Sequence, residues 1–234
     1  MTKIIAIVSG KGGTGKTTVA INLALAMNEF GHNVILLDAD LRSADIGLLL
    51  GVPPSISTLH DALAGQKNIT EVVYHHPSGL NFIPGSIAAR NMARVDLQPI
   101  LSRLRGTVEI IIMDLPAGLH QEVFSLLRIA DEAIIVTNPE LPAVTDALKT
   151  IALVEQESKV VRGVVVNRYG PDSMPLGSIQ EMLDQEILGV VPEDDYVKRS
   201  VQVKYPVTYA YPLAPASASF KNIAASLLGK RAVH

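Results

Sequence analysis

Short runs of apolar residues, rich in Val, Ile and Leu, alternate along the chain with longer stretches whose apolar residues recur every three or four positions. The short runs hold almost no polar positions, a pattern typical of parallel strands covered on both faces. The longer stretches predict helices, most clearly at Thr17–Phe30, Pro142–Glu157 and Leu176–Asp184. The runs predicted as strands are Ile4–Val8, Val34–Leu37, Leu80–Pro84, Glu109–Met113, Ala133–Thr137, Val161–Val166 and Ile187–Val191.

Repeated alternation of strand and helix predicts an α/β fold: one doubly wound, mostly parallel sheet flanked by helices. Such sheets bind ligands at the carboxyl ends of their strands. Residues 204–215, rich in proline and tyrosine, are predicted as an ordered loop, and Ser219–Leu228 as a closing helix. We find no internal repeat or low-complexity linker, so we expect a single domain over residues 1–234.

A phosphate-binding loop is predicted between the first strand and the first helix. Residues 10–17 read Gly-Lys-Gly-Gly-Thr-Gly-Lys-Thr and match G-x-x-x-x-G-K-[ST] at every fixed position. The glycines let backbone N–H groups turn toward phosphate oxygens, and the helix N-terminus adds its positive dipole end. We expect Lys16 to reach the terminal phosphates, Thr17 to ligate Mg²⁺ and Thr18 to donate to the α-phosphate. The residues expected to bind the nucleotide phosphates are Gly10, Lys11, Gly12, Gly13, Thr14, Gly15, Lys16, Thr17 and Thr18.

Carboxylates follow two of the predicted strands, where a bound nucleotide would need them. Asp114 ends one strand and is predicted to hold the hydration shell of Mg²⁺. Asp40 follows another and is predicted to orient the attacking water, mainly by hydrogen bonding. Asp38, two residues earlier, fits a site residue and a helix cap equally well. Lys11 stands inside the loop, so it serves its own nucleotide or one in a facing subunit.

Composition removes several classes of function. The chain has no cysteine, which excludes disulfides, Cys-ligated zinc, iron–sulfur clusters and Cys nucleophiles from this chain alone. Lys+Arg 20 against Asp+Glu 23 gives a net charge of −3, which argues against binding nucleic acid through bulk charge. No apolar stretch reaches the ~18 residues of a membrane span. Adjacent His75 and His76 precede a turn signature and are expected to be exposed.

Taken together, these motifs resemble the MinD/ParA family of deviant-Walker P-loop ATPases, most of all its archaeal MinD-type members. Residues 11–18 match the family's K-G-G-x-G-K-T-T, and the resemblance extends from residue 2 to about 228. The other matching segments are Asp38-Ala39-Asp40, Asp114–Gly118, Thr137-Asn138-Pro139-Glu140 with Asp146, Val166-Asn167-Arg168 and Val191-Pro192-Glu193-Asp194.

The resemblance implies an ATPase that works as a dimerisation switch. Mg·ATP would close two subunits face to face, with Lys11 acting across the interface, and slow, partner-stimulated hydrolysis would separate them. An unidentified regulatory or effector protein would read the switch, in a task such as placing the division site or a cargo. The resemblance implies that Lys11, Lys16 and Asp40 take part in catalysis. It implies that Thr17, Asp40 and Asp114 bind the metal ion. On the adenine side it implies that the nucleotide is bound by Asn167, Arg168, Pro192 and Glu193.

The chain differs from some family members at its C-terminal end and at Asp45, and two other functions remain possible on the same fold. Only Gly229–His234 follow the last predicted helix, so we expect a cytoplasmic protein that reaches a membrane through a partner rather than directly. Asp45 stands where some relatives have Asn, which bears on coupling to a partner. No Asp follows Asn167-Arg168 at the guanine-reading position, which favours adenine, and we expect no sequence-specific nucleic acid binding. The alternatives are a metabolic ATP-dependent ligase or kinase, which would need an inserted lid, and a scaffold that binds nucleotide without hydrolysing it.

Overall fold

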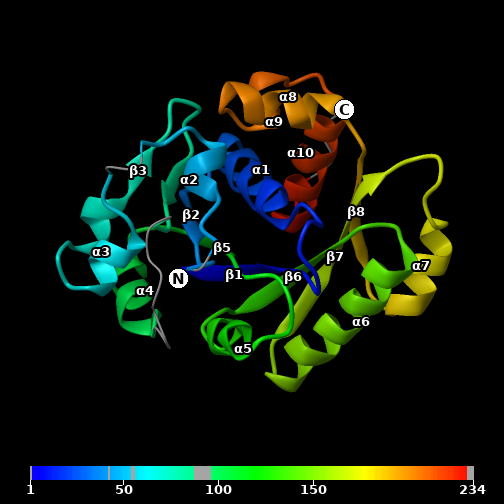
Figure 1. The fold of residues 1–234 in the computed structure, drawn as a ribbon, viewed down its shortest axis with the longest axis horizontal. Coiled ribbons are helices and arrows are strands. Elements are labelled where there is room, and N and C mark those ends of the chain that lie inside the picture. The colour runs from blue at the N-terminus through cyan, green and yellow to red at the C-terminus, as the bar shows by residue number, and fades with distance from the viewer. Residues whose placement is uncertain (1, 42, 54–55, 87–95, 231–234) are drawn as a thin grey trace.

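The fold is built on one eight-stranded sheet, seen edge-on in the middle of the computed structural model in Figure 1. The structure describes residues 2–41, 43–53, 56–86 and 96–230. The strand order is β3-β4-β2-β5-β1-β6-β7-β8, and all neighbouring pairs are parallel except β3 with β4. The strands are β1 Lys3–Val8, β2 Val34–Asp38, β3 Tyr74–His75, β4 Asn81–Ile83, β5 Ile110–Asp114, β6 Glu132–Thr137, β7 Val160–Tyr169 and β8 Ile187–Pro192.

Helices cover both faces of the sheet, and Figure 1 shows α1 and α10 on one side and α5 and α6 on the other. Their bounds are α1 Lys16–Glu29, α2 Ile46–Leu49, α3 Leu59–Leu63, α4 Gln98–Leu104, α5 Gln121–Leu127, α6 Leu141–Gln156, α7 Leu176–Leu183, α8 Asp195–Val203, α9 Val207–Ala210 and α10 Pro215–Leu227, with a 3-10 turn, η1, at Ile69–Val72. The predicted doubly wound, mostly parallel α/β fold is therefore confirmed.

Two apolar cores, one on each face, hold these layers together. Alternate residues of β1 enter opposite cores: Ile4 and Ala6 pack with residues of α4 to α7, while Ile5 and Ile7 pack with α1 and α10. A central strand flanked by helices on both sides buries both of its faces, so its residues need not alternate between apolar and polar. Burial on both faces explains why the strands read as continuous apolar runs.

Several elements differ from the sequence-based expectation. Strand β7 extends to Tyr169, and α10 begins at Pro215 rather than Ser219 because proline is well suited to the first turn of a helix. The segment expected to be a loop contains the short helix α9. His75 lies exposed in β3, but His76 is buried, contrary to expectation, since its Nδ1 lies 2.8 Å from the Ser78 hydroxyl and its Nε2 3.2 Å from the Lys204 carbonyl.

Within the described ranges, no helix has both the length and the apolar character needed to cross a membrane.

Candidate functional site

The predicted phosphate loop joins β1 to α1 at the carboxyl edge of the sheet. Gly13 and Gly15 have φ values of 80° and 85°, a backbone region that residues with a Cβ rarely adopt. Helix α1 begins at Lys16, and no side chain caps its N-terminus. Its first backbone N–H groups therefore have no partner within the helix and are available to an anion.

Gly10 and Gly12 begin the loop, and Thr18 ends it within the first turn of α1. A Cβ at Gly10 would collide with the backbone of Asp146 in α6, so this glycine lets the loop approach the helix closely. Gly12 is exposed and Thr18 is half-buried. The Thr18 carbonyl accepts a hydrogen bond of 2.8 Å from the Asn22 amide, which anchors the first turn of α1.

The strand order brings the two predicted acidic strand ends together beside this loop. Strand β5 lies between β2 and β1, and Asp38 and Asp114 are direct partners in the β2–β5 register. Both carboxylates thus reach the edge of the sheet where the loop leaves β1. Neither side chain is more than 2% exposed.

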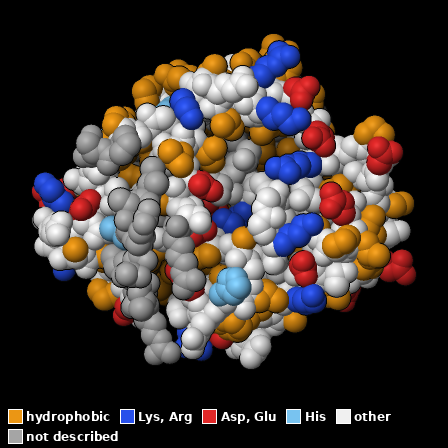
Figure 2. Space-filling view, viewed as in Figure 1, with side chains coloured by type: hydrophobic (Ala, Val, Ile, Leu, Met, Phe, Trp, Pro, Cys, Tyr) orange, Lys and Arg blue, Asp and Glu red, His pale blue; other side chains and the backbone are white. Residues whose placement is uncertain are grey.

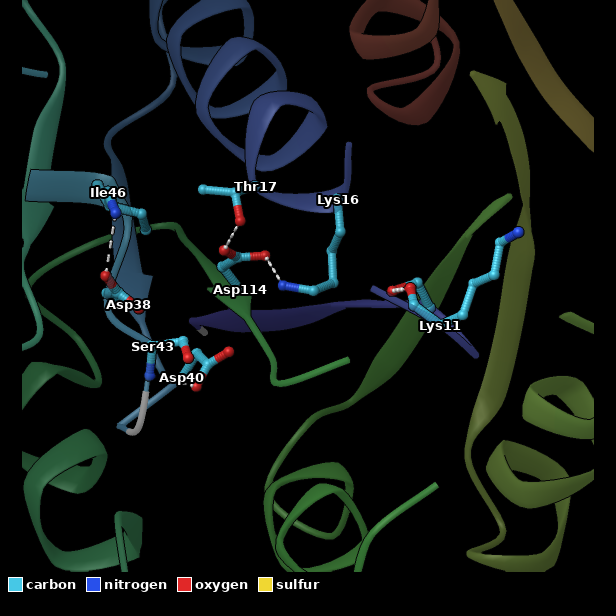
Figure 3. Close-up of polar contacts among 9 residues, drawn as sticks. Lys11, Lys16, Thr17, Asp38, Asp40, Ser43, Ile46 and Asp114 are labelled. Carbon is cyan, nitrogen blue, oxygen red and sulfur yellow. Dashed lines mark hydrogen bonds and ion pairs between the residues drawn. The ribbon is translucent and has the colours of Figure 1, made fainter. Parts of the chain in front are cut away.

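Asp114 is the centre of the site because it binds two residues of the phosphate loop. Its Oδ1 lies 2.6 Å from Lys16 Nζ, and its Oδ2 accepts a hydrogen bond of 2.6 Å from the Thr17 hydroxyl (Figure 3). A hydroxyl and a carboxylate are hard oxygen ligands of the kind that Mg²⁺ prefers. Because Thr17 and Asp114 touch each other, one cation could reach an oxygen of each.

The electrostatics of the site are dominated by buried carboxylates. Burial raises the pKa of Asp114, and the Lys16 ammonium opposes that shift. Burial and the neighbouring Asp114 charge raise the pKa of Asp38 well above its usual range. Asp38 Oδ2 accepts a weak hydrogen bond of 3.2 Å from the Ile46 N–H, whereas Oδ1 has no hydrogen-bond partner among the residues that the structure describes.

Asp40 lies on the loop after β2, near the end of β5 that carries Asp114 (Figure 3). Its Oδ1 accepts a 3.0 Å hydrogen bond from the Ser43 N–H, and the side chain is half-buried. Asp45 immediately precedes α2, and burial together with the charges of Asp40 and Asp114 raises its pKa. The loop after β2 thus adds negative charge at the opening of the site.

The second loop lysine points away from this centre. In Figure 3 the Lys11 side chain extends to the side opposite Asp40, and its Nζ lies 3.7 Å from Glu140 Oε2 just before α6. Both side chains are exposed to a third or more, so this ion pair is weak in water. Its exposure leaves Lys11 able to reach a group on another molecule.

The predicted adenine-side residues lie at the ends of β7 and β8. Asn167 is buried, and its Nδ2 donates a 2.7 Å hydrogen bond to the Thr14 carbonyl in the phosphate loop. Arg168, with φ 60°, and Glu193 are exposed, while Pro192 is half-buried. A pocket of about 280 Å³ opens there, lined by residues 138–140, 168, 170–173 and 193.

Lys198 and Arg199 lie exposed on α8. Lys198 Nζ is 3.2 Å from Asp195 and 3.7 Å from Glu193, and the Arg199 guanidinium stacks over the Tyr196 ring. On the face shown in Figure 2, Lys and Arg side chains are interspersed with Asp and Glu side chains.

Asn138 and Glu140 belong to the site, although the sequence assigned them no role of their own. Asn138 is buried and donates to carbonyls of the phosphate loop and of β7, and Glu140 holds Lys11. Both follow β6, so a polar segment directly after a predicted strand was the signal that could have identified them.

Comparison with known proteins agrees with this geometry. Residues 1–228 match the ParA family model, described as NUBPL iron-transfer P-loop NTPase. An ATP-binding protein of uncharacterised function from Methanocaldococcus jannaschii is 39% identical over 232 residues, covering 97% of this chain and 88% of that protein. Because this chain has no cysteine, it offers no thiolate for iron.

Solved MinD structures are similar to this chain over almost its whole length. The septum site-determining protein MinD of Pyrococcus horikoshii OT3, in complex with Mg-ADP, is 34% identical with a TM-score of 0.90, over 97% of this chain and 96% of that one. MinD in the MinC:MinD complex of Aquifex aeolicus is 26% identical with a TM-score of 0.89, over 100% and 98% of the two chains. This chain belongs to the MinD/ParA family of P-loop ATPases.

Proposed function

We propose that this protein binds and hydrolyses ATP with Mg²⁺ and uses the nucleotide to switch between a monomer and a face-to-face homodimer. The buried contact of Lys16 and Thr17 with Asp114 is the observation that carries this proposal. In this proposal Lys16 would supply a cation for phosphate, and Thr17 and Asp114 would supply two oxygens for Mg²⁺, at the N-terminus of α1. The Mg-ADP bound to the MinD of Pyrococcus horikoshii supports the same chemistry here.

Nucleotide binding would change the partner of Lys16. In the structure the Lys16 ammonium pairs with Asp114 at 2.6 Å. A terminal phosphate would accept from Lys16, and the oxygens of Asp114 and Thr17 would hold Mg²⁺, Asp114 through the hydration shell of the ion. The ion, when bound, neutralises phosphate charge, and the backbone N–H groups of the loop and of α1 surround the phosphate oxygens.

Asp40 would orient the water that attacks the terminal phosphate. It lies at the opening of the site and is anchored by the Ser43 N–H at 3.0 Å, which fixes one carboxylate oxygen. In phosphoryl transfer, positioning and charge stabilisation contribute most of the rate enhancement, so a carboxylate that positions water matters more than one that removes its proton.

Lys11 would act in the dimer. Exposed, and held among the described residues by the weak ion pair with Glu140, it can leave that carboxylate for the phosphates of a nucleotide in the facing subunit. Asn167 would read the adenine edge, with Arg168, Pro192 and Glu193 around the base.

A regulatory protein would sense the dimer, and the MinC:MinD complex of Aquifex aeolicus supports a role in spatial positioning, such as placement of the division site or a cargo.

The deciding experiment is the solution mass of the Asp40→Ala variant, measured by light scattering with Mg·ATP and with Mg·ADP. Slowed hydrolysis should trap the ATP-bound pair, so we expect a dimer with ATP and a monomer with ADP. The exposed Asp195→Ala variant on α8 serves as a control for the loss of a carboxylate. A monomer under both conditions, with ATP shown to be bound by titration, would overturn the switch and favour a metabolic enzyme instead.

A further inference from the structure

Two side-chain amides from neighbouring strand ends meet at one carbonyl of the phosphate loop. The Thr14 carbonyl accepts from Asn167 Nδ2 at 2.7 Å and from Asn138 Nδ2 at 3.4 Å. Asn138 Nδ2 also donates to the backbone carbonyl of Asn167 at 3.0 Å. Asn138 and Asn167 are 6% and 5% exposed, so these bonds lie out of water, where their loss costs most.

These contacts fix which end of the Asn167 amide faces the loop. A backbone carbonyl can only accept, so the nitrogen end of the amide must point at Thr14. The oxygen end, Oδ1, receives no hydrogen bond from any residue in the described part of the chain. Asn167 therefore offers an acceptor, with its orientation set by the loop.

Asn138, which directly follows β6, contacts both the phosphate loop and the backbone of Asn167. Its amide ties the end of β6 to the backbone of Asn167 on β7 and to Thr14 in the loop, and it lines the pocket that Arg168 and Glu193 also line. Without it, the Asn167 backbone and the Thr14 carbonyl would lose their shared donor. Because Asn167 Nδ2 would keep its bond to Thr14, the Asn167 amide and the loop carbonyl would then shift together relative to the base.

We propose that Asn138 is a positioning residue that orients Asn167 so that the site selects purine nucleotides with a 6-amino group over those with a 6-oxo group. This inference rests on the proposed function, since it assumes that Asn167 reads the base. The 6-amino group of adenine donates, whereas the 6-oxo group of hypoxanthine or guanine accepts. The acceptor Oδ1 of Asn167 forms a hydrogen bond with a 6-amino group, whereas it faces the lone pairs of a 6-oxo group.

The test compares Mg·ADP with Mg·IDP, because IDP has a 6-oxo group and a proton on N1 where ADP has a 6-amino group and an unprotonated N1, and neither diphosphate requires hydrolysis. We expect isothermal titration of the unmodified protein to give about tenfold tighter binding of ADP, as one buried hydrogen bond predicts. Asn138→Ala should bring the ADP:IDP ratio to within about twofold of one. Asn138→Asp keeps the side-chain volume but has no amide proton to donate, and should lower the ratio as well.

Asn22→Ala is the matched control. Asn22 is also buried, and its amide accepts from Thr208 and donates to the Thr18 carbonyl, so the variant loses a buried amide away from the base. It should weaken ADP and IDP binding equally and leave the ratio unchanged. Circular dichroism of each variant identifies any loss of fold, and Asn138→Asp carries the test if the alanine variant does not fold.

Two outcomes would overturn the proposal while leaving nucleotide binding and the dimerisation switch of the proposed function intact. Equal weakening of ADP and IDP by both Asn138 variants would make Asn138 a structural residue only. Equal affinity of the unmodified protein for ADP and IDP would show that Oδ1 does not select the 6-amino group. If the unmodified protein binds neither nucleotide, the proposed function itself fails.

Discussion

Lys16 and Asp114 form a buried ion pair, with 2.6 Å between Nζ and Oδ1 and side chains that are 8% and 2% exposed. Forming such a pair removes two charges from water, and the cost of this desolvation offsets most of their attraction, so the net contribution to stability is small. Removing one partner is costly, because it leaves the other charge buried without a counter-charge. In the proposed function, the same lysine that pairs with Asp114 also binds the phosphate, so its removal should affect both stability and binding. Mutation can separate the two effects.

Lys16→Ala should abolish nucleotide binding and also destabilise the fold by about 3 kcal/mol, because Asp114 loses its counter-charge. Adding Asp114→Asn should restore part of the stability, since the remaining buried group is neutral, but not the binding. Urea unfolding measures the first effect and titration with Mg·ADP the second. Lys3→Ala, which breaks the Lys3–Glu132 pair of 2.7 Å at the opposite end of β1, should leave ADP affinity intact. ADP affinity that survives Lys16→Ala would refute the assignment of Lys16.

Lys11→Ala, introduced into the Asp40→Ala protein, should prevent the ATP-dependent doubling of mass. The reason is that Lys11 is exposed and points away from Asp114, and we propose that it contacts the phosphates of the facing subunit. Light scattering with Mg·ATP measures the mass. Lys149→Ala, on an exposed α6 lysine paired with Asp146 at 3.0 Å, is the control and should still give a dimer. A dimer formed without Lys11 would contradict its role across the interface.

The sequence predicted the fold well because the central strands are buried on both faces. Continuous apolar runs marked β1, β5 and β6, and the loop motif located the start of α1. Strand β3, with two residues at the edge of the sheet, has too little pattern to be recognised. Short helices such as α2 and α9 span one turn and show no apolar periodicity.

The sequence predicted which site residues lie at strand ends, but it did not predict which of these residues contact one another. Nothing local shows that β6 lies beside both β1 and β7, so the meeting of Asn138 and Asn167 at Thr14 depends on strand order. Likewise, burial of His76 depends on the Lys204 carbonyl, 128 residues away. Asp38 accepts a hydrogen bond from the Ile46 N–H at the start of α2 and lies beside Asp114, a position that fits either of its two predicted roles.

Asp38→Asn should raise stability at neutral pH. In the folded protein the pKa of Asp38 lies well above the value of about 4 typical of unfolded chains, so the buried ionised form destabilises the fold. This penalty is absent below about pH 4 and grows as the pH rises through the folded pKa. We expect Asp38→Asn to raise the melting temperature by about 2–4 °C at pH 7.5, with the difference shrinking toward pH 4.

Thermal unfolding of both proteins from pH 4 to 8 tests this dependence, because titration of all other groups is largely common to the two. Asp195→Asn, which changes an exposed carboxylate on α8, should show little difference at any pH. A difference between Asp38→Asn and the unmodified protein that does not vary with pH would rule out ionisation of Asp38 as its cause.

Gly189→Ala should destabilise the protein by about 1–3 kcal/mol, because a Cβ at this position of β8 would collide with the Ile223 side chain of α10. Ile223 is buried, so it has little room to move away. In the double variant with Ile223→Ala, the collision disappears, and the combined loss should be smaller than the sum of the single losses. Gly177→Ala in α7, where the added Cβ meets no atom of the described residues within 4 Å apart from its neighbours in the helix, should be neutral or stabilising by up to about 1 kcal/mol.

Urea unfolding of the four variants measures these effects, and additive losses at Gly189 and Ile223 would show that the two positions do not interact.

The same variants test whether the packing of β8 against α10 positions the residues predicted to contact adenine. Strand β8 ends at Pro192, next to Glu193, and its close approach to α10 sets where both lie. Gly189→Ala should therefore also weaken Mg·ADP binding, whereas Gly177→Ala, in a helix that contributes no predicted site residue, should not.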